Sequence, residues 1–281
     1  MNRFIDLHTH STCSDGTLTP DELVKKAAGI GLSAVALTDH DTIDGLKPAL
    51  ARADGRDIEI IPGIELSTEY KGRDIHIVGL FIRYEDAGFQ SRLQEFCHSR
   101  DIRNEKMAAR LTEAGFPISM EELTDAFPDA VITRSQFARL MMEKGYVKEM
   151  KEAFEKYIGD TCPCFVPREK VTPQGGVRLI LDAGGVPVLA HPTLYHMKEE
   201  ELDTLILSLK EAGLIAIEGL YSTYTVAEQA MVRRLARKHG LLISGGSDFH
   251  GSNKPGLDLG TGYGNLKIPY DILEQLRRSI P

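Results

Sequence analysis

Phe4-Ile5-Asp6-Leu7-His8-Thr9-His10, followed closely by Ser14-Asp15-Gly16, is the most informative segment of the chain. Its first residues are typical of an apolar β-strand, and its last residues carry two imidazoles. Because side chains alternate between the two faces of a strand, His8 and His10 project to the same side. Two imidazoles with a carboxylate nearby suit a borderline divalent metal such as zinc, manganese or iron. Alone, the pair is equally typical of histidines in a core.

Strands and helices are expected to alternate along the chain after this segment. Thr19-Pro20, with Glu22 three positions after the threonine, predicts a capped helix that runs to about residue 30. The apolar run 34–37 predicts a strand buried on both faces, as in a parallel sheet. Further strands are expected at 58–61, 186–190, 215–218 and 241–244, with a hairpin formed by 66–70 and 74–81. This alternation indicates an α/β fold with a parallel sheet or barrel.

Residues 87–164 have a different pattern. Charged helical segments are expected there at 89–114, 119–127, 135–144 and 149–158, without a strand pattern between them. We therefore expect a barrel domain made of residues 1–86 and 165–281. Residues 87–164 would be a helical insertion that leaves and re-enters the sheet and covers the active site.

The ends of five predicted strands carry residues of the types that bind metals: His8 with His10, His40, Glu65, His191, and Asp248 with His250. In (β/α) barrels the catalytic groups lie at the carboxyl ends of the strands, so these side chains would converge. One histidine after a strand is usually a loop residue, whereas five such strand ends point to a metal site. His76 lies on the second arm of the hairpin. His98, His196 and His239 are expected on the surface or on helices.

Composition restricts the partners. The chain has 281 residues, of which 42% are hydrophobic and 26% charged, and its net charge of −8 argues against nucleic-acid binding over the whole surface. The 4 cysteines lack a second C-x-x-C for a structural zinc and are expected to be reduced thiols. An immediate N-terminal strand leaves no room for a signal peptide, and no apolar run is long enough to span a bilayer. A cytoplasmic protein without membrane contact is expected.

On these residues, the sequence resembles the PHP (polymerase and histidinol phosphatase) family of metal-dependent phosphoesterases. The motifs run from Asp6 to His250: D-L-H-T-H-S-x-x-S-D-G, A-L-T-D-H-D-T, P-G-I-E, H-I-V-G-L, A-H-P and G-S-D-F-H. The insertion, with Thr133-Arg134-Ser135-x-Phe137-Ala138-Arg139 and Phe165-Val166-Pro167, looks like the branch that acts on nucleotides. That branch contains 3′,5′-nucleotide bisphosphate phosphatases and 5′→3′ exoribonucleases on short RNA.

The resemblance implies a distorted seven-stranded (β/α) TIM-like barrel with an inserted helical subdomain. It also implies three divalent metal ions (Mn²⁺, Fe²⁺ or Zn²⁺). Carried over by position, the ligands of the first ion are His8, His10, Glu65 and Asp248. Glu65 would bridge to a second ion, whose other ligands are His76 and His191. The third ion would be held by Asp15, His40 and His250.

The activity implied by the resemblance is hydrolysis of a phosphate monoester by a metal-bridging hydroxide, with Asp248, His250 and Glu65 in catalytic roles. Metal binding lowers the pKa of water toward about 7, so no side-chain nucleophile is needed. Arg134 is the leading phosphate contact because a guanidinium matches phosphate bidentately. Other substrate contacts are expected from Ser135, from His196, which could also protonate the leaving oxygen, and more weakly from Arg168 and Lys170.

The sequence leaves several alternative functions open. Within phosphoesterases, a cyclic phosphodiesterase and a histidinol-phosphate-type phosphatase are alternatives, and Thr193-Leu194-Tyr195-His196 departs from the Gly-Arg that often follows A-H-P in this branch. An amidohydrolase-like C–N hydrolase would need a carboxylated lysine where Glu65 and His76 stand. A metal-dependent binding module is the non-enzymatic alternative. Since only 7% of the residues are aromatic, a nucleotide or short oligonucleotide fits better than a long duplex. The oligomeric state is open.

Overall fold

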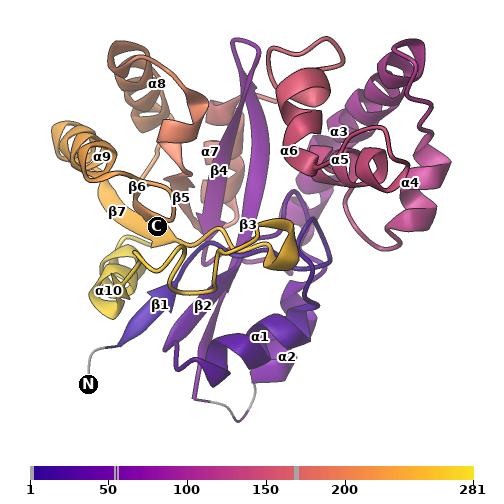
Figure 1. Cartoon of the computed structure of the whole chain (residues 1–281). Helices are drawn as coiled ribbons and strands as arrows, with labels where there is room; N and C mark the ends of the chain where they lie inside the picture. Colours follow the sequence, from indigo (N-terminus) through magenta and orange to yellow (C-terminus); the bar gives the residue numbers. More distant parts are fainter. Residues whose placement is uncertain (1–2, 54, 56, 168–170) are drawn as a thin grey trace.

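A sheet that curls into a nearly closed barrel forms the centre of the computed structural model, which describes residues 3–53, 55, 57–167 and 171–281 (Figure 1). The strands are β1 (Phe4–Asp6), β2 (Ala34–Leu37), β3 (Glu59–Tyr70), β4 (Arg73–Leu80), β5 (Val186–Leu189), β6 (Ala216–Tyr221), β7 (Leu242–Gly246) and β8 (Ile268–Pro269). Their order in the sheet is β7-β6-β5-β4-β3-β2-β1-β8. The predicted α/β barrel is confirmed.

The barrel is closed by backbone contacts between β1 and β7. The Leu7 N–H donates to the Gly245 carbonyl over 3.2 Å, and the Asp248 N–H donates to the His8 carbonyl over 2.9 Å. The predicted number of seven strands is exceeded by one, because the two-residue strand β8 pairs antiparallel with the outer side of β1. This closure brings the first and last sequence motifs next to each other.

The central hairpin differs from the prediction. We expected a strand at 58–61 and a separate hairpin arm at 66–70, but β3 runs through both without interruption and pairs antiparallel with β4. Pro62-Gly63 does not break the strand, because Pro62 pairs with Leu37 of β2. A Cβ on Gly63 would lie 2.8 Å from Thr38 Cγ2, so glycine permits the close approach of the neighbouring strand.

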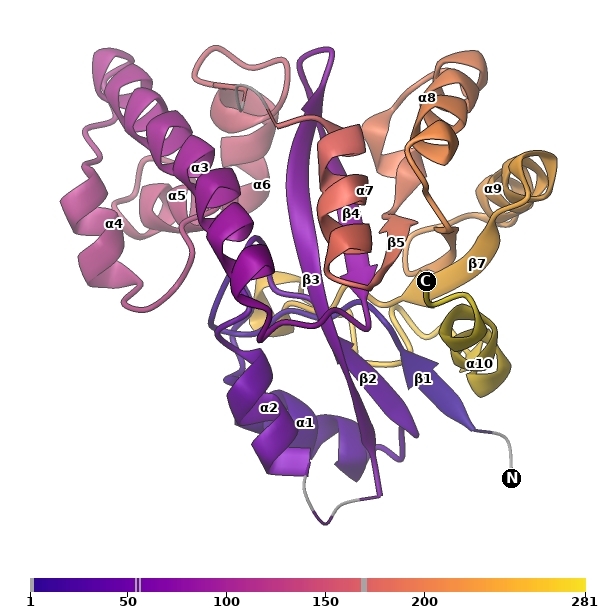
Figure 2. The same cartoon turned by 180° about the vertical axis from the view of Figure 1, so that it is seen from behind.

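Helices cover the outside of the sheet (Figure 2). They are α1 (Pro20–Gly29), α2 (Leu46–Ala53), α7 (Pro173–Asp182), α8 (Glu199–Glu211), α9 (Val226–His239) and α10 (Tyr270–Arg278). The predicted capping box of α1 is confirmed, since the Glu22 N–H donates to Thr19 Oγ1 while the Thr19 N–H donates to Glu22 Oε2. Among the described helices, none is long and apolar enough to cross a membrane.

The segment between β4 and α7 is helical and lies beside the β3–β4 hairpin (Figures 1 and 2). It contains α3 (Ala87–Glu113), α4 (Met120–Ala126), α5 (Arg134–Glu143) and α6 (Met150–Ala153). The helix expected over 149–158 is shorter than predicted, because a π-helical turn, Phe154–Ile158, follows α6. The predicted inserted helical subdomain is confirmed as part of the fold, and its division from the barrel at residues 87 and 164 stays a prediction.

Three hydrophobic clusters follow the alternation of side chains. Ala34 and Ala36 of β2 belong to the cluster inside the barrel, whereas Val35 and Leu37 belong to the cluster between strands and helices. Leu273 and Leu276 of α10 join the inner cluster and close one end of the barrel. A third cluster, which extends from Met107 to Val166, forms the core of the helical segment. The apolar residues therefore leave the other end of the barrel to polar side chains.

Candidate metal centre

Nine imidazole and carboxylate side chains meet at that open end of the barrel. They are the nine residues predicted as ligands: His8, His10, Asp15, His40, Glu65, His76, His191, Asp248 and His250. Eight of them are buried, and His76 is partly exposed. His8 follows β1, His40 follows β2 and His191 follows β5, whereas Glu65 and His76 lie within β3 and β4. The geometry brings all nine together.

Glu65 lies at the centre of this cluster, and each of its two oxygens faces a different set of imidazoles. Oε1 lies 3.0 Å from His76 Nδ1 and 3.1 Å from His191 Nε2. Oε2 lies 3.2 Å from a ring nitrogen of each of three histidines: His8, His10 and His40. A carboxylate with its two oxygens in two donor sets is suited to bridge two cations.

The other two carboxylates, Asp15 and Asp248, share His250 as a partner, and each also faces a histidine that contacts Glu65. Asp15 Oδ1 lies 3.1 Å from His250 Nε2, and Asp15 Oδ2 lies 3.9 Å from His40 Nε2. Asp248 Oδ1 lies 3.3 Å from both His10 Nε2 and His250 Nδ1. The ligand atoms form four overlapping groups, and within each group all the atoms lie within 4.8 Å of one another.

The cluster fits divalent cations. Imidazole and carboxylate together are the donor set of zinc, manganese and iron. His8 Nε2 and His10 Nε2 lie only 3.1 Å apart, a distance at which two lone pairs can share a cation. Within the described part of the chain, the buried Nδ1 atoms of His10 and His191 make no hydrogen bond.

Burial and the neighbouring carboxylates shift the pKa values of two histidines of the cluster in opposite directions. Burial lowers the pKa of His10, but the hydrogen bonds to Asp248 and Glu65 outweigh it and raise the pKa to about 9. Burial dominates at His40 and lowers its pKa to about 3, so that this ring is a neutral donor.

Three residues that follow strands at the cluster have a strained backbone conformation. Asp41, His191 and Asp248 have φ values of 53°, 25° and 57°, a region that residues with a side chain seldom adopt. Such conformations cost on the order of 1–3 kcal/mol each and persist where the surroundings fix them. Asp41 is fixed by buried Arg100 of α3, whose Nε donates to Asp41 Oδ2 over 2.8 Å.

The loop that carries Asp15 is held by Asp39. The Ser11 N–H and hydroxyl donate to Asp39 over 2.7 and 2.6 Å, and the Ser14 hydroxyl donates over 2.7 Å. A Cβ on Gly16 would lie 2.4 Å from the His10 carbonyl oxygen, so the turn requires glycine there. Asp15 is thereby fixed against His250.

Three residues that orient the cluster were not predicted as site residues. Glu218, at the middle of β6, accepts from His8 Nδ1 over 2.9 Å and from the His191 N–H over 2.7 Å. Tyr221 and Lys254 both donate to Asp248 Oδ2, which leaves Oδ1 toward the histidines. Glu218 ended a predicted strand as the other ligands did, so its position was a usable signal. Lys254 lies in a loop, where nothing in the sequence pattern marked it.

The bond from Glu218 to His8 predicts an effect on metal affinity. Glu218→Gln cannot accept at both atoms, so His8 loses the partner that directs Nε2 toward Glu65. Loss of a residue that hydrogen-bonds to a metal ligand typically lowers metal affinity about 10–100-fold. We expect a weakening of this size in a competitive metal titration of the folded variant. The matched control is Glu59→Gln on β3, where the carboxylate pairs with Arg277 away from the cluster; equal affinities in the two variants would contradict the assignment.

Only some of the predicted substrate contacts lie at the cluster. Arg134 and Ser135 line a cavity of about 110 Å³ together with His40, His76 and Arg103. Arg134 already pairs with Asp74 over 2.8 Å and with Asp160 over 2.6 Å. His196 is exposed after the 3-10 turn Pro192–Tyr195 and belongs to none of the ligand groups found among the described residues. Arg168 and Lys170 lie outside the described residues.

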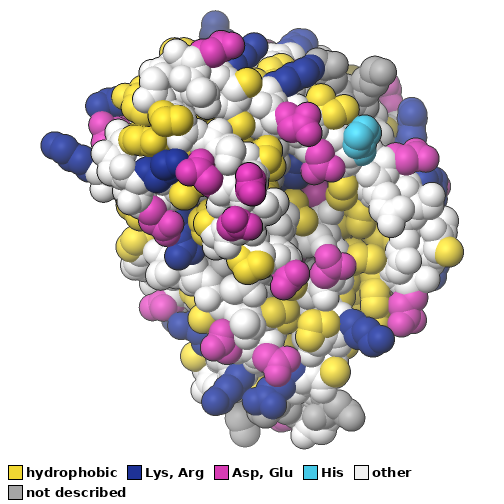
Figure 3. Space-filling model, turned by 90° about the vertical axis from the view of Figure 1, so that its right-hand side faces the viewer, with side chains coloured by type: hydrophobic (Ala, Val, Ile, Leu, Met, Phe, Trp, Pro, Cys, Tyr) yellow, Lys and Arg dark blue, Asp and Glu magenta, His cyan; other side chains and the backbone are white. Residues whose placement is uncertain are grey.

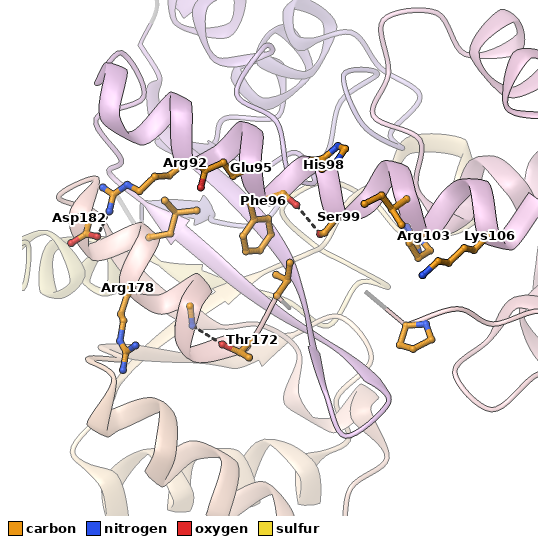
Figure 4. Close-up of a pocket in the computed structure, with 15 residues that line it drawn as sticks. Arg92, Glu95, Phe96, His98, Ser99, Arg103, Lys106, Thr172, Arg178 and Asp182 are labelled. Atoms are coloured by element: carbon orange, nitrogen blue, oxygen red, sulfur yellow. Dashed lines mark hydrogen bonds and ion pairs between the residues drawn. The ribbon is translucent and has the colours of Figure 1, made fainter. Parts of the chain in front are cut away.

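A cavity of about 620 Å³ lies elsewhere, between α3 and α7 (Figure 4). Phe96 and Ser99 of α3 project into it, and the ion pair between Arg92 and Asp182 lies at one end. None of the nine clustered residues lines this cavity. The smaller cavity is the better candidate for the reacting group, because it contacts the cluster directly.

Comparisons with known proteins agree with this geometry. The 5′-3′ exoribonuclease of Haemophilus influenzae is 36% identical over 250 residues, which cover 89% of this chain and 91% of that protein. The 3′,5′-nucleoside bisphosphate phosphatase of Chromobacterium violaceum is 35% identical over 257 residues, with coverages of 91% and 90%. A solved structure from Chromobacterium violaceum, named an amidohydrolase with bound sulfate and no metal, has a TM-score of 0.87 at 34% identity and covers 98% of this chain and 96% of that one. The family model described as the PHP domain matches residues 6–245, and the chain belongs to this family.

Proposed function

We propose that this protein is a metal-dependent phosphoesterase that hydrolyses phosphate monoesters of nucleotides. The observation that carries the proposal is the convergence of nine ligand side chains beside a small cavity lined by three arginines, Arg100, Arg103 and Arg134. The cations favoured by the cluster and the arginines beside it are the two kinds of group that bind phosphoryl oxygens.

The proposed ligands fall into three sets. The first is His8, His10, Glu65 and Asp248; the second is Glu65, His76 and His191; the third is Asp15, His40 and His250. The separate donor sets of the two Glu65 oxygens support its role as the bridge. Divalent ions bound here would supply a water of lowered pKa and neutralise charge on the phosphoryl group. Mn²⁺, Fe²⁺ and Zn²⁺ all remain candidates for this donor set.

Side chains of the protein would hold the metal ligands in position. Asp248, held by Tyr221 and Lys254, presents one oxygen to the cluster, and His250 lies beside it. The helical segment 87–164 would cover the site, which is supported by its contact with Asp15, whose Oδ2 accepts from Thr133 Oγ1 over 3.2 Å. His196 stays a predicted proton donor to the leaving oxygen.

Arg134 would bind the substrate phosphate. Arg134→Ala is expected to raise KM at least about tenfold with a smaller change in kcat, because a guanidinium–phosphate pair contributes about 1.5–3 kcal/mol. Steady-state kinetics with the nucleotide substrate measure this split. The control is Arg92→Ala, which removes an arginine that pairs with Asp182 far from the cluster. Unchanged kinetics on every phosphoester tested would remove Arg134 from the site.

A small substrate fits the surface better than a long nucleic acid. On the face seen in Figure 3, basic and acidic side chains are interspersed, and the described residues there form no continuous basic band. Duplex binding relies on many Lys and Arg contacts with phosphates. We therefore propose a nucleotide or a short oligonucleotide as substrate. The cytoplasmic location expected from the sequence stays part of the proposal.

Among phosphoesterases, the relatives named above act as a bisphosphate phosphatase and a 5′-3′ exoribonuclease, and both activities are candidates here. A cyclic phosphodiesterase and a histidinol-phosphate-type phosphatase are less favoured. The nucleotide-acting relatives are 36% and 35% identical to this chain, whereas the phosphoribosyl 1,2-cyclic phosphate 1,2-diphosphodiesterase of Eggerthella lenta is 29% identical over a similar length. The C–N hydrolase alternative is not favoured, because the bridging position is occupied by Glu65 and not by a lysine.

A hydrolysis screen with two readouts tests the proposal. Inorganic phosphate is measured for the monoesters, and nucleotide products are separated by chromatography for RNA and cyclic nucleotides, because cleavage of a diester releases no inorganic phosphate. The manganese-loaded protein is incubated with nucleoside 3′,5′-bisphosphates, short 5′-phosphorylated RNA, cyclic nucleotides, histidinol phosphate and sugar phosphates. We expect the highest kcat/KM for one of the first two classes. Highest activity on a sugar phosphate or histidinol phosphate would contradict the nucleotide assignment, and hydrolysis of amides without phosphate release would contradict the reaction class.

A further inference from the structure

The cavity at the metal cluster is too small for a whole nucleotide. Its volume is about 110 Å³, which is about four waters at roughly 30 Å³ each and suits a phosphoryl group. The remainder of the substrate therefore has to lie in adjoining space.

A second cavity adjoins the first at Asp15 and Ser135, which line both. Its volume is about 310 Å³, at the lower end of the range of roughly 300–1,000 Å³ for small-molecule sites. A group bonded to a phosphate at the cluster would pass Ser135 and enter this space. The larger cavity between α3 and α7 shares Arg103 with the first but contacts none of the clustered ligands.

The second cavity is built by three segments that are tied together. The insertion contributes Phe127 and Gln136, and the Gln136 amide donates to the Ser14 carbonyl. The Val131 N–H donates to the Cys13 carbonyl over 3.0 Å. On the other side, Asn253 Nδ2 donates to the Asp15 carbonyl over 2.8 Å. These bonds form the cavity before any ligand binds.

The walls of this cavity differ in chemistry. Phe127 provides an aromatic ring, and the Arg139 guanidinium lies 5.3 Å from its centroid. Glu143 accepts from Arg139 Nε over 3.0 Å and holds the guanidinium in place. Thr12 and Thr17, two residues with hydroxyl groups, also line the cavity. Aromatic rings and guanidinium planes are the surfaces on which nucleobases stack, and hydroxyls suit a ribose.

We propose that the cavity between Phe127, Arg139 and the loop 12–17 is the nucleoside subsite, with room for one base and its ribose. This inference rests on the proposed function and deepens it, because the subsite selects nucleotides over phosphate esters without a base. One nucleoside at a time enters, so a short RNA would be processed from its end.

The test compares Phe127→Leu, which keeps an apolar side chain without the ring, and Arg139→Gln with the wild type. The matched control is Tyr263→Leu, because Tyr263 is an exposed aromatic that lines neither cavity. The KM for adenosine 3′,5′-bisphosphate reports on the whole substrate, whereas the inhibition constant of inorganic phosphate reports on the phosphoryl site alone. Both are measured on the manganese-loaded protein.

We expect both subsite variants to raise this KM roughly tenfold, the effect of losing one base stack, with the phosphate inhibition constant unchanged. An unchanged KM in both variants, or a parallel rise of the phosphate constant, would overturn the subsite. If the wild type hydrolyses no nucleotide, the proposed function fails, and calorimetric binding of AMP then tests the subsite by itself. Weaker AMP binding by Phe127→Leu supports the subsite, and equal binding overturns it.

Discussion

Glu65→Ala is expected to abolish phosphate release and to lower the bound metal content. This carboxylate is buried, and its two oxygens contact five imidazoles in two sets. Removing it deletes the only group that we propose to bridge two ions. The loss should exceed the ~10–100-fold effect of losing a residue that hydrogen-bonds to a metal ligand, such as Glu218. Asp248→Ala should act in the same direction, since it removes the carboxylate that faces His10 and His250.

The measurement pairs kinetics with metal analysis of the purified, folded variants. Glu65→Gln separates charge from shape, because the amide keeps the volume and loses the negative charge. The matched control is Glu69→Ala, four residues further along β3, where the carboxylate accepts from the Gly72 N–H in the hairpin turn. Full activity or full metal content in Glu65→Ala would end the metal-centre assignment.

Chelation should have an effect of similar size on the unmodified protein. Removing divalent ions is expected to reduce phosphate release below detection, and manganese should restore it, because the cluster itself contains no nucleophile positioned by a general base. The melting temperature should fall as well, since a ligand at a hundred times its Kd stabilises the folded state by about 2.7 kcal/mol. Phosphate release and thermal unfolding are followed before chelation, after chelation and after metal return.

Phosphate release and thermal unfolding have separate controls. Magnesium and calcium, which prefer all-oxygen sites, should restore less activity than manganese at equal concentration. Turnover that persists in protein verified to be free of metal would contradict the proposed reaction. A melting temperature that chelator does not change would contradict binding of ions by the folded state.

The barrel and its ligand residues could be predicted because both follow local rules. Short apolar runs such as 34–37 indicate buried parallel strands, and the carboxyl ends of such strands meet at one face. His8, His40 and His191 each follow a strand, so their convergence followed from the fold class. Glu65 was predicted in the same way, because it follows the expected strand 58–61, although it lies inside the longer strand β3. His76 lies inside β4, and only the resemblance to the PHP family assigned it to the cluster.

What escaped prediction depends on contacts between distant segments. Lys254 reaches Asp248 from a loop, and Arg100 reaches Asp41 from the helical segment. Neither residue lies at a strand end, so periodicity gives no signal for it. The continuity of β3 through Pro62-Gly63 has the same origin, because it depends on pairing with β2 and β4. Tertiary pairing overrode the local tendency of Pro-Gly to end a strand.

Anomalous diffraction from crystals grown with manganese tests the central claim most directly. We predict peaks within the cluster, with one flanked by Glu65 Oε1, His76 and His191 and another between Asp15, His40 and His250. Well-ordered side chains without any anomalous peak, under conditions in which the protein releases phosphate, would contradict the account.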